Sequence, residues 1–296
     1  MLPGKFKSRM QAIAKNRRDG AIELAIKVID TFLELKRSRV SYTERDIERI
    51  VKSVSKAQPS MVPIHNSLEI CEKIIFTEGE VVNRLGQFKS YLKNSREIVA
   101  EKFTESMLSE TKCITLSRSS TVLTALQLAA KAGKLCKLVI MESRPRYEGR
   151  ITAKEMRRHG VNCTLVADAL GPSLVGEVDM AVVGSDAVLK DGAVVNKIGT
   201  YPLSLACTMV GRPLYVLAES IKLDSRYDSD SWPGSELRDK TELLPPKLRG
   251  MKAINRYFDL TLPAYIHAVV HEGGISRKHW VAEMEKELQN QLYVST

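Results

Sequence analysis

The sequence has few cysteines and no long hydrophobic run. Its 296 residues include five widely spaced cysteines and no CxxC pair, which argues against a disulfide framework or a four-thiolate zinc site. No stretch approaches the roughly 18 consecutive apolar residues of a membrane helix. The basic amino terminus lacks the apolar core of a secretory signal. We therefore expect a cytoplasmic protein with no membrane partner.

Nucleotide and metal motifs are missing as well. The sequence contains no GxxxxGK[ST], no GxGxxG and no HExxH, so none of the sites that these motifs build is predicted. His267 and His271 lie four residues apart on a predicted helix, but two histidines alone do not indicate a metal site. Aromatic residues make up 6% of the chain, which is few for the stacking platforms of RNA readers. We expect no metal, no cofactor and no direct RNA ligand.

Positive charge is in surplus. The chain has 45 Lys and Arg against 35 Asp and Glu, a net charge of +10 at pH 7. Residues 1–20 carry six cationic side chains and one acidic one, which is half of that surplus. The surplus favours anionic partners without choosing among nucleic acids, phosphorylated metabolites and acidic proteins. The amino-terminal segment is either a solvated helix face or a docking surface.

Residues 1–110 predict a helical domain. In segment 21–36, apolar residues recur at the three- and four-residue spacing of a helix with one buried face. The helix expected over residues 41–57 begins with a cap, Ser41 or Thr43, followed by acidic residues in its first turn. No strand pattern interrupts this half of the chain.

From residue 111 the pattern changes to short apolar runs, namely KCITLS, CKLVIMES, NCTLVAD, DMAVVGSD and RPLYVLAES. Helical or glycine-containing segments separate them, as in parallel sheets covered on both faces. The predicted fold class is α/β, with an N-terminal helical domain at residues 1–110 and a Rossmann-like parallel-sheet domain at residues 111–296. Segment 225–240, rich in Ser and Asp, is predicted to be a long exposed loop.

Polar side chains follow the ends of these predicted strands. Right-handed crossovers bring the carboxyl ends of parallel strands to one edge, where open α/β sheets bind ligands. Cations and hydroxyls there suit a phosphorylated polyol, and Asp186 could move a proton or accept a hydrogen bond from a sugar hydroxyl. Any single group could instead only cap a helix or pair with a neighbour. The candidate binding residues are Ser119, Ser120, Thr121, Arg144, Arg150, Asn196, Lys197 and Lys222.

Three stretches of the sequence are distinctive enough to indicate a protein family. They are residues 142–169 (ESRPRYEGRITAKEMRRHGVNCTLVADA), 178–207 and 213–220. They resemble the superfamily of the α, β and δ subunits of translation initiation factor two-B. That superfamily includes sugar-phosphate isomerases acting on methylthioribose 1-phosphate and ribose 1,5-bisphosphate. The resemblance implies self-association through the sheet domain, as a homodimer or a higher homo-oligomer.

In the isomerases that the sequence resembles, a cysteine and an aspartate work as an acid–base pair. The aspartate matches Asp186, but Ser117 takes the place of the cysteine. A thiol with an ordinary pKa of about 8.5 ionises usefully near neutral pH, whereas an unassisted serine hydroxyl does not. If the chain is an enzyme, Asp186 and Ser117 are its catalytic candidates.

Two phosphate-binding motifs of the isomerases are also altered. Their Arg-Gly-Ala motif corresponds to Asp19, Gly20 and Ala21 unless a one-residue shift aligns Arg18. Their Arg-Pro-Thr motif corresponds to the segment that begins at Gln58. Gly20 is carried over as a binding residue. The pocket therefore resembles that of the family, while the catalytic groups differ.

Two functional hypotheses follow from these departures. The first is an archaeal-type, non-catalytic relative of the regulatory subunits, binding a sugar phosphate or nucleotide and a protein partner such as the initiation factor two α subunit. The second is an aldose–ketose isomerase of a sugar phosphate, similar to ribose 1,5-bisphosphate isomerase, with Asp186 as acid and base. The sequence does not identify the ligand, and it leaves open whether catalysis survives the replacement at Ser117.

Overall fold

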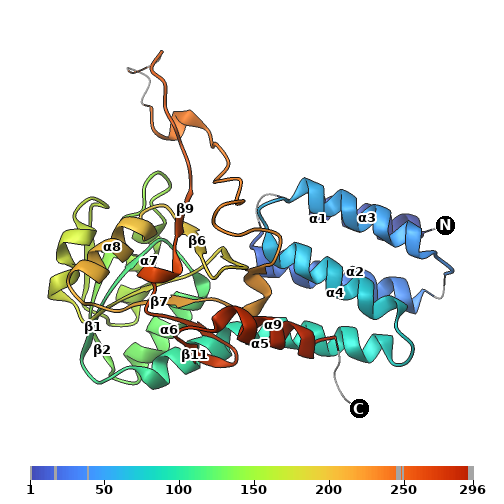
Figure 1. Ribbon diagram of the computed structural model, residues 1–296, viewed down its shortest axis with the longest axis horizontal. Helices are drawn as coiled ribbons and strands as arrows, with labels where there is room; N and C mark the ends of the chain where they lie inside the picture. Colours follow the sequence, from blue (N-terminus) through green and yellow to red (C-terminus); the bar gives the residue numbers. More distant parts are fainter. Residues whose placement is uncertain (1, 17–18, 39, 245–247, 249, 293–296) are drawn as a thin grey trace. The chain divides into compact units, whose positions relative to one another are not determined.

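The computed structural model describes residues 2–16, 19–38, 40–244, 248 and 250–292 (Figure 1). Packing divides the chain into two compact units, each described by itself below. The helical unit comprises Met1–Ser95, Ser220–Lys222 and Met284–Thr296, and the sheet unit comprises Arg96–Glu219 and Leu223–Glu283. The boundary between the units falls inside helix α5 (Val81–Ser106), whereas the division expected at residue 110 follows this helix.

The described part of the helical unit is built on helices, among them the two predicted over residues 21–36 and 41–57. Up to Ser95, these helices are α1 (Gly4–Lys15), α2 (Ala21–Arg37), α3 (Glu44–Ala57), α4 (Val62–Phe76) and the first part of α5. Their apolar faces meet in one hydrophobic core, in which the rings of Phe6 and Phe32 pack edge to face at 5.6 Å. Thr43 caps α3, because its Oγ1 accepts a hydrogen bond from the backbone N–H of Asp46 at 3.2 Å.

The sheet unit is built on a seven-stranded sheet in the order β11-β10-β7-β4-β1-β2-β3. The strands are β1 (Thr111–Leu116), β2 (Leu135–Met141), β3 (Cys163–Val166), β4 (Met180–Val183), β7 (Leu214–Leu217), β10 (Ala268–His271) and β11 (Gly274–Ser276). All neighbours pair in parallel except β10 and β11. The parallel strands follow the doubly-wound Rossmann order, whose direction reverses between β1 and β4.

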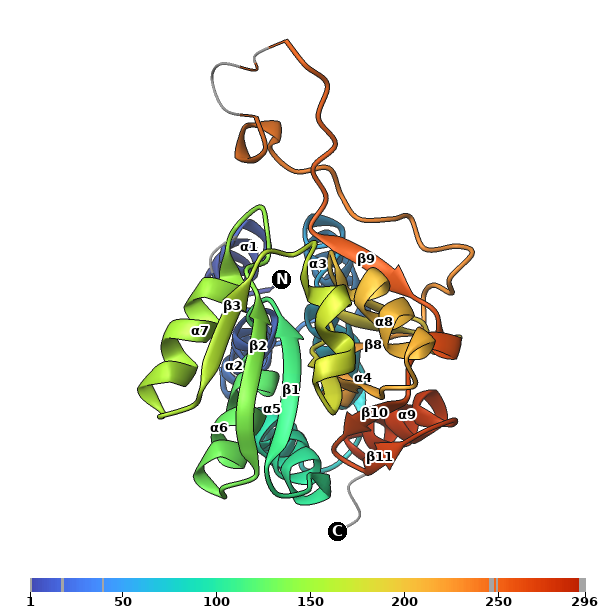
Figure 2. The same cartoon turned by 90° about the vertical axis from the view of Figure 1, so that its left-hand side faces the viewer.

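Different helices cover the two faces of this sheet (Figure 2). The second part of α5, α6 (Ser120–Lys131) and α7 (Glu148–Arg158) share a core with one face. Helix α8 (Thr200–Met209) contacts β4 and the 3-10 helix Gly171–Glu177, and Met141 lies against Gly171 on this second face. This layered arrangement confirms the predicted α/β fold class.

A second, four-stranded sheet in the order β8-β5-β6-β9 was not predicted from the sequence. It contains β5 (Ala187–Leu189), β6 (Val194–Lys197), β8 (Leu223–Asp224) and β9 (Phe258–Thr261). Much of the described part of the long segment between β8 and β9 extends away from both sheets in the two views (Figures 1 and 2). It contains the segment 225–240 that was predicted to be a loop, with a short 3-10 helix at Lys240–Glu242.

Two local predictions are wrong. His271 ends strand β10 and is not on a helix, because the buried run Ala268–His271 pairs with β7 and β11. A short apolar run fits either structure, and tertiary pairing decides between them. The apolar run around Cys136 predicts a core thiol, but Cys136 is exposed, because the first residues of β2 alternate between buried and exposed positions.

Within the described residues, no three or more His, Cys, Asp or Glu side chains are grouped so as to hold a metal ion. No helix in the described part of the chain is long and apolar enough to cross a membrane. The final helix, α9 (Trp280–Asn290), begins in the sheet unit and ends in the helical unit.

Candidate functional site

Ser117 directly follows β1 and has a left-handed backbone with φ of 62°. Its N–H donates to Ser143 Oγ at 2.6 Å, and its carbonyl accepts a hydrogen bond from Thr152 Oγ1 at 2.8 Å. A left-handed non-glycine residue costs free energy and persists where its surroundings fix it. The hydroxyl of Ser117 makes no hydrogen bond to the described residues, so the fold fixes its backbone but does not activate the side chain.

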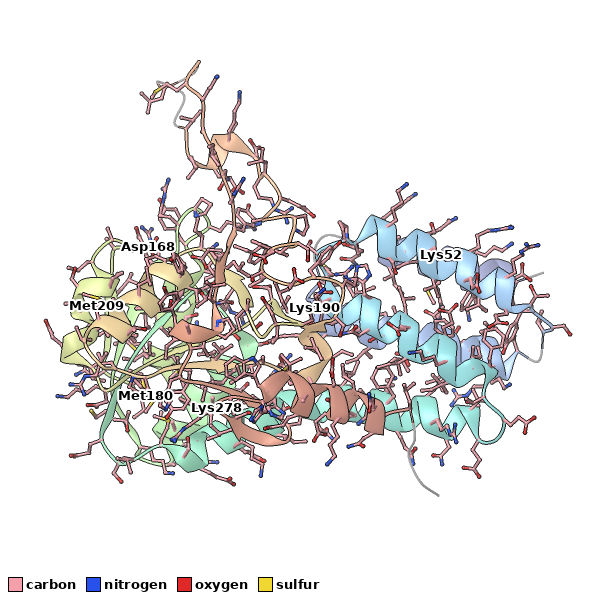
Figure 3. The ribbon with its side chains drawn as sticks, in the orientation of Figure 1. Lys52, Asp168, Met180, Lys190, Met209 and Lys278 are labelled. Atoms are coloured by element: carbon pink, nitrogen blue, oxygen red, sulfur yellow. The ribbon has the colours of Figure 1, made fainter. Side chains whose placement is uncertain are left out.

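Asp168, which follows β3, holds the loop after β2 by hydrogen bonds (Figure 3). The two carboxylate oxygens of Asp168 each accept a hydrogen bond at 2.7 Å, one from the N–H of Ser143 and one from that of Arg144. Ser143 also has a left-handed backbone, with φ of 66°. Asp168 therefore acts as a positioning residue for the loop that holds Ser117.

The hydroxyl-rich start of α6 lies against the end of β4. Ser119 caps α6 by accepting a hydrogen bond from the N–H of Val122 at 3.4 Å. A Cβ atom on Gly184 would lie 2.5 Å from Ser119 Oγ, so only glycine permits this close approach. Ser120 is exposed at the first turn of α6, where free N–H groups favour anions.

Thr121, in the same turn, is buried, and its Oγ1 donates to Glu219 Oε1 at 2.5 Å. Glu219 follows β7, the neighbour of β4, and is 1% exposed. The hydroxyl of Thr121 is therefore directed at a buried carboxylate, and its predicted contact with a phosphate competes with this bond.

Between β4 and α8, Asp186 precedes β5 and Asn196 lies in β6. Asp186 is exposed, and its N–H donates to the carbonyl of Val195 at 2.9 Å. Asn196 is buried, and its Nδ2 donates to Thr200 Oγ1 at 2.9 Å. The side chain of Asp186 is exposed, and its role as acid and base stays a prediction.

Lys197 is almost completely buried and is paired inside the sheet unit. Its Nζ lies 3.0 and 2.9 Å from the two carboxylate oxygens of Glu148, and its side chain is 5% exposed. The Tyr257 ring centre lies 5.0 Å from the same Nζ. The ring also faces the guanidinium groups of Arg146, at 5.9 Å, and Arg238, at 5.2 Å.

The carboxylate of Glu242 also contacts Tyr257. Tyr257 Oη donates to Glu242, at 2.5 and 2.7 Å from its two oxygens. The hydrogen bond from Tyr257 lowers the pKa of Glu242, and the contact with Tyr257 raises the pKa of Arg146. We call Arg146, Glu148, Lys197, Arg238, Glu242 and Tyr257 the tyrosine cluster.

The two predicted arginines, Arg144 and Arg150, both contact the ring of Tyr147. Arg144 donates to Tyr147 Oη, and its guanidinium lies 5.0 Å from that ring. Arg150 lies 3.9 Å from the ring and pairs with Glu142 at 2.6 Å. Both guanidinium groups are thus engaged with neighbours, so their predicted binding of phosphate requires these contacts to rearrange.

The remaining predicted residues belong to the helical unit. Gly20 precedes α2, and its N–H donates to Glu23 Oε2 at 3.4 Å. Lys222 ends the 3-10 helix Ser220–Lys222. Arg18, the alternative position for the altered arginine motif, lies outside the described residues.

Gln58 and Asp19 have structural roles in this unit. Gln58 is 3% exposed, and its Nε2 donates to the carbonyls of Ile13, Ala14 and Asn16, at 3.0, 3.2 and 2.7 Å. It therefore satisfies the carboxyl end of α1. The hydrogen bond from Lys27, at 2.5 Å, lowers the pKa of Asp19.

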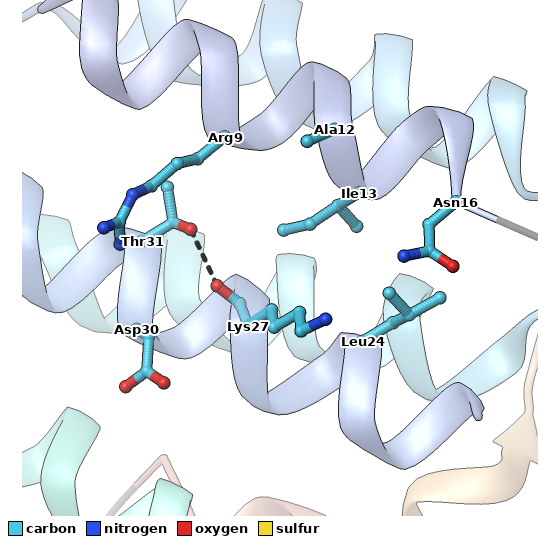
Figure 4. A pocket seen from close by; sticks show the side chains of 8 residues that line it. All are labelled: Arg9, Ala12, Ile13, Asn16, Leu24, Lys27, Asp30 and Thr31. Carbon is cyan, nitrogen blue, oxygen red and sulfur yellow. Dashed lines mark hydrogen bonds between the residues drawn. The ribbon is translucent and has the colours of Figure 1, made fainter. Parts of the chain in front are cut away.

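A pocket of about 270 Å³ lies between α1 and α2 of the helical unit (Figure 4). Apolar side chains form much of its lining, and Arg9 and Lys27 stand at its rim. Both cations are engaged, Arg9 with Glu34 and Lys27 with Asp19. The pocket contains none of the residues predicted as a site.

Sequence reasoning missed Glu148, Tyr257 and Glu219. Glu148 follows the arginine-rich stretch directly and could have been noted as an ion-pair partner. Tyr257 is 60 residues from Lys197, and no local pattern indicates their contact. Glu219 was visible at the end of a predicted strand, but its burial follows only from the packing of β7 against β4 and β10.

The model of the Initiation factor 2 subunit family matches residues 17–278. The chain is 30% identical over 276 residues to a translation initiation factor eIF-2B subunit 2-like protein of Pyrococcus horikoshii, covering 93% of this chain and 97% of that protein. It is 27% identical over 238 residues to the ribose 1,5-bisphosphate isomerase of Archaeoglobus fulgidus, covering 78% and 76%.

The fold is similar to a solved structure of the same description. The crystal structure of the Pyrococcus horikoshii translation initiation factor eIF-2B superposes with a TM-score of 0.76 and 29% identity, over 93% of this chain and 98% of that one. Relatives of both functional kinds are thus similar to this chain at nearly equal identity.

Proposed function

Because this chain belongs to the Initiation factor 2 subunit family, we propose that it acts as a non-catalytic, initiation factor 2B-like regulatory subunit. Membership confirms the resemblance inferred from the sequence. In this proposal the protein is an archaeal-type, cytoplasmic homo-oligomer. It binds a phosphorylated small molecule at the carboxyl edge of the large sheet and a protein partner elsewhere.

The state of Ser117 carries the proposal. This residue stands where the isomerases resembled by the sequence have a cysteine, and its hydroxyl makes no hydrogen bond to the described part of the chain. A serine hydroxyl needs an adjacent base to serve as an acid–base group near neutral pH. Asp186 alone leaves a two-group proton transfer incomplete.

The ligand class is supported by the groups at the sheet edge. Ser119 and Ser120 lie at the start of α6, whose N–H groups favour anions. Asn196 and Lys197 end β6 and begin the turn into α8. A phosphorylated polyol offers both the anion and the hydroxyls that these groups bind.

Phosphorus NMR with ribose 1,5-bisphosphate and methylthioribose 1-phosphate tests the proposal. We expect no product resonance and a protein-dependent broadening of at least one ligand resonance. A product resonance that Asp186→Asn abolishes would overturn the non-catalytic assignment. If neither broadening nor product is observed, the proposal of a phosphorylated ligand is wrong.

The protein partner requires a separate test. Sedimentation of this chain with an archaeal initiation factor two α subunit at micromolar concentrations is expected to show a complex, and sedimentation of the chain alone gives its oligomeric state. Absence of any complex would contradict the regulatory assignment.

The isomerase remains the second candidate, because Asp186 is exposed at the sheet edge and a ribose 1,5-bisphosphate isomerase is 27% identical to the chain. Ser117→Cys separates the two. In an isomerase fold that lacks only its thiol, restoring it should raise turnover by about 10²-fold, the lower end for general acid–base catalysis. In a regulatory subunit, the change leaves turnover undetectable.

A further inference from the structure

We propose that Glu148 competes with the ligand anion for Lys197 and thereby determines which anionic ligands the sheet edge accepts. The inference rests on the proposed function, because it concerns the same site. It assigns a role to a residue that the sequence analysis did not select.

The geometry leaves an incoming anion one way to reach Lys197. Both oxygens of Glu148 lie within 3.0 Å of Lys197 Nζ. The Lys197 side chain is 5% exposed, whereas that of Glu148 is 26% exposed. Glu148 therefore lies on the solvent side of the pair, and a ligand must displace it before contacting the ammonium group.

The second neighbour of the Lys197 ammonium group is not a carboxylate. It is the ring of Tyr257, whose centre lies 5.0 Å from Nζ. Over the residues that the structure describes, Glu148 provides the carboxylate within ion-pair distance of Lys197. A buried ammonium group that loses its counter-charge is strongly destabilised, so Lys197 exchanges one anion for another and does not stand unpaired.

This exchange makes the site selective for charge. A phosphate dianion carries more charge than a carboxylate and offers at least as many acceptor oxygens. Neutral ligands or weak monoanions gain too little from Lys197 to displace a carboxylate that is already tethered there. Apparent affinity falls in proportion to the fraction of molecules in which the binding group is free.

The same helix provides a matched control. Glu155, also on α7, pairs with Arg118 at 3.1 Å, but the side chain of Arg118 is 42% exposed. Ligands can reach Arg118 from solvent without breaking that pair. Glu155→Gln removes the same charge from the same helix and leaves the Lys197 pair intact.

Isothermal titration with inorganic phosphate and with ribose 1,5-bisphosphate tests the inference. We expect Glu148→Gln to bind both probes at least about tenfold more tightly than the unmodified protein, because truncating one member of a close charge pair leaves the other in need of an anion. Glu155→Gln should change affinity less than about twofold, as for exposed pairs. Adding Lys197→Met to Glu148→Gln should abolish the gain.

The outcomes separate this inference from the proposed function. Equal affinities of the unmodified protein and Glu148→Gln for ribose 1,5-bisphosphate would overturn the inference and leave the ligand site standing. If no variant binds either probe, the proposal of a phosphorylated ligand fails too. Should Glu148→Gln fold poorly by circular dichroism, Glu148→Asp replaces it. Its shorter carboxylate reaches Lys197 less well, so an unchanged affinity would again overturn the inference.

Discussion

In the helical unit, Thr43 and Asp46 cap the first turn of α3 at the surface, whereas in the sheet unit Asp259 reaches from β9 to the first turn of α8. Asp259 Oδ2 accepts hydrogen bonds from the N–H groups of Gly199, at 2.7 Å, and Tyr201, at 3.2 Å. Its Oδ1 is buried without a hydrogen-bond partner among the described residues.

The pKa values of the two capping carboxylates shift in opposite directions. The hydrogen bond from the N–H of Thr43 lowers the pKa of Asp46, whereas burial raises the pKa of Asp259 from 3.8 to about 6. The first cap is local in sequence, and the second joins residues about 60 positions apart. The difference teaches that the cap in the helical unit forms from neighbouring residues, whereas the cap in the sheet unit requires the tertiary fold.

The largest change in the free energy of unfolding is expected when two glycines are compared, one on a helix of each unit. A Cβ atom on Gly149, in α7, would lie 1.9 Å from the carbonyl oxygen of Met141, whereas one on Gly86, in α5, would meet nothing within 4 Å. We expect Gly149→Ala to lower the free energy of unfolding by about 3 kcal/mol or more, because backbone must move. Gly86→Ala should raise it by up to about 1 kcal/mol. Urea denaturation measures both, and equal effects would contradict the tight packing of α7 on β2.

A pH titration of stability compares the two capping carboxylates. Because the folded pKa of Asp259 is raised, its contribution is present below its ordinary pKa and is lost as the pH rises through about 6. The unmodified protein should therefore lose up to about 3 kcal/mol relative to Asp259→Asn between pH 4 and 7.

The sign reverses for Asp46, whose folded pKa is lowered. Its contribution is present above its ordinary pKa and is lost as the pH falls below it. Unfolding free energies of Asp46→Asn, measured over a pH series that extends below the ordinary pKa of 3.8, provide the control. If both variants shift in the same direction, the contrast between the caps is wrong.

Gln58 tests the comparison further, because it makes a long-range polar contact inside the helical unit. Gln58→Ala removes the Nε2 donor from the carbonyls at the end of α1, and we expect the free energy of unfolding to fall by about 2 kcal/mol. Gln11→Ala, at an exposed position of α1, should change stability by less than about 0.5 kcal/mol. Thermal unfolding followed by circular dichroism distinguishes them, and a neutral Gln58→Ala would refute the capping role.

The smallest of these effects on stability is expected at Gly184, where a substitution should change ligand affinity more than stability. A Cβ atom there collides with Ser119, so Gly184→Ala displaces the hydroxyl that caps α6, at a cost of about 1 kcal/mol. Affinity for ribose 1,5-bisphosphate should fall about tenfold, since a charge-assisted contact is lost. Gly176→Ala meets nothing within 4 Å and is the control; equal affinities would remove Ser119 from the site.

Much of the fold was predictable because its signals are local. The apolar spacing of α2, the capping residues of α3 and the runs that became β1, β2, β3, β4 and β7 each depend on a few neighbouring residues. The run Ala268–His271 was misassigned, and the β8-β5-β6-β9 sheet was missed. Their strands are short, and only pairing with distant partners makes them strands.

The sequence by itself determined the α/β class and predicted that Ser117, Ser119 and Asp186 follow strands of the sheet. These follow from periodicity and strand order, which act over short stretches of chain. Only the tertiary structure decided that Lys197 is paired with Glu148, 49 residues away, and that Asp259 caps α8. A buried charge takes whichever opposite charge the folded path brings within reach, and that path is a property of the whole chain.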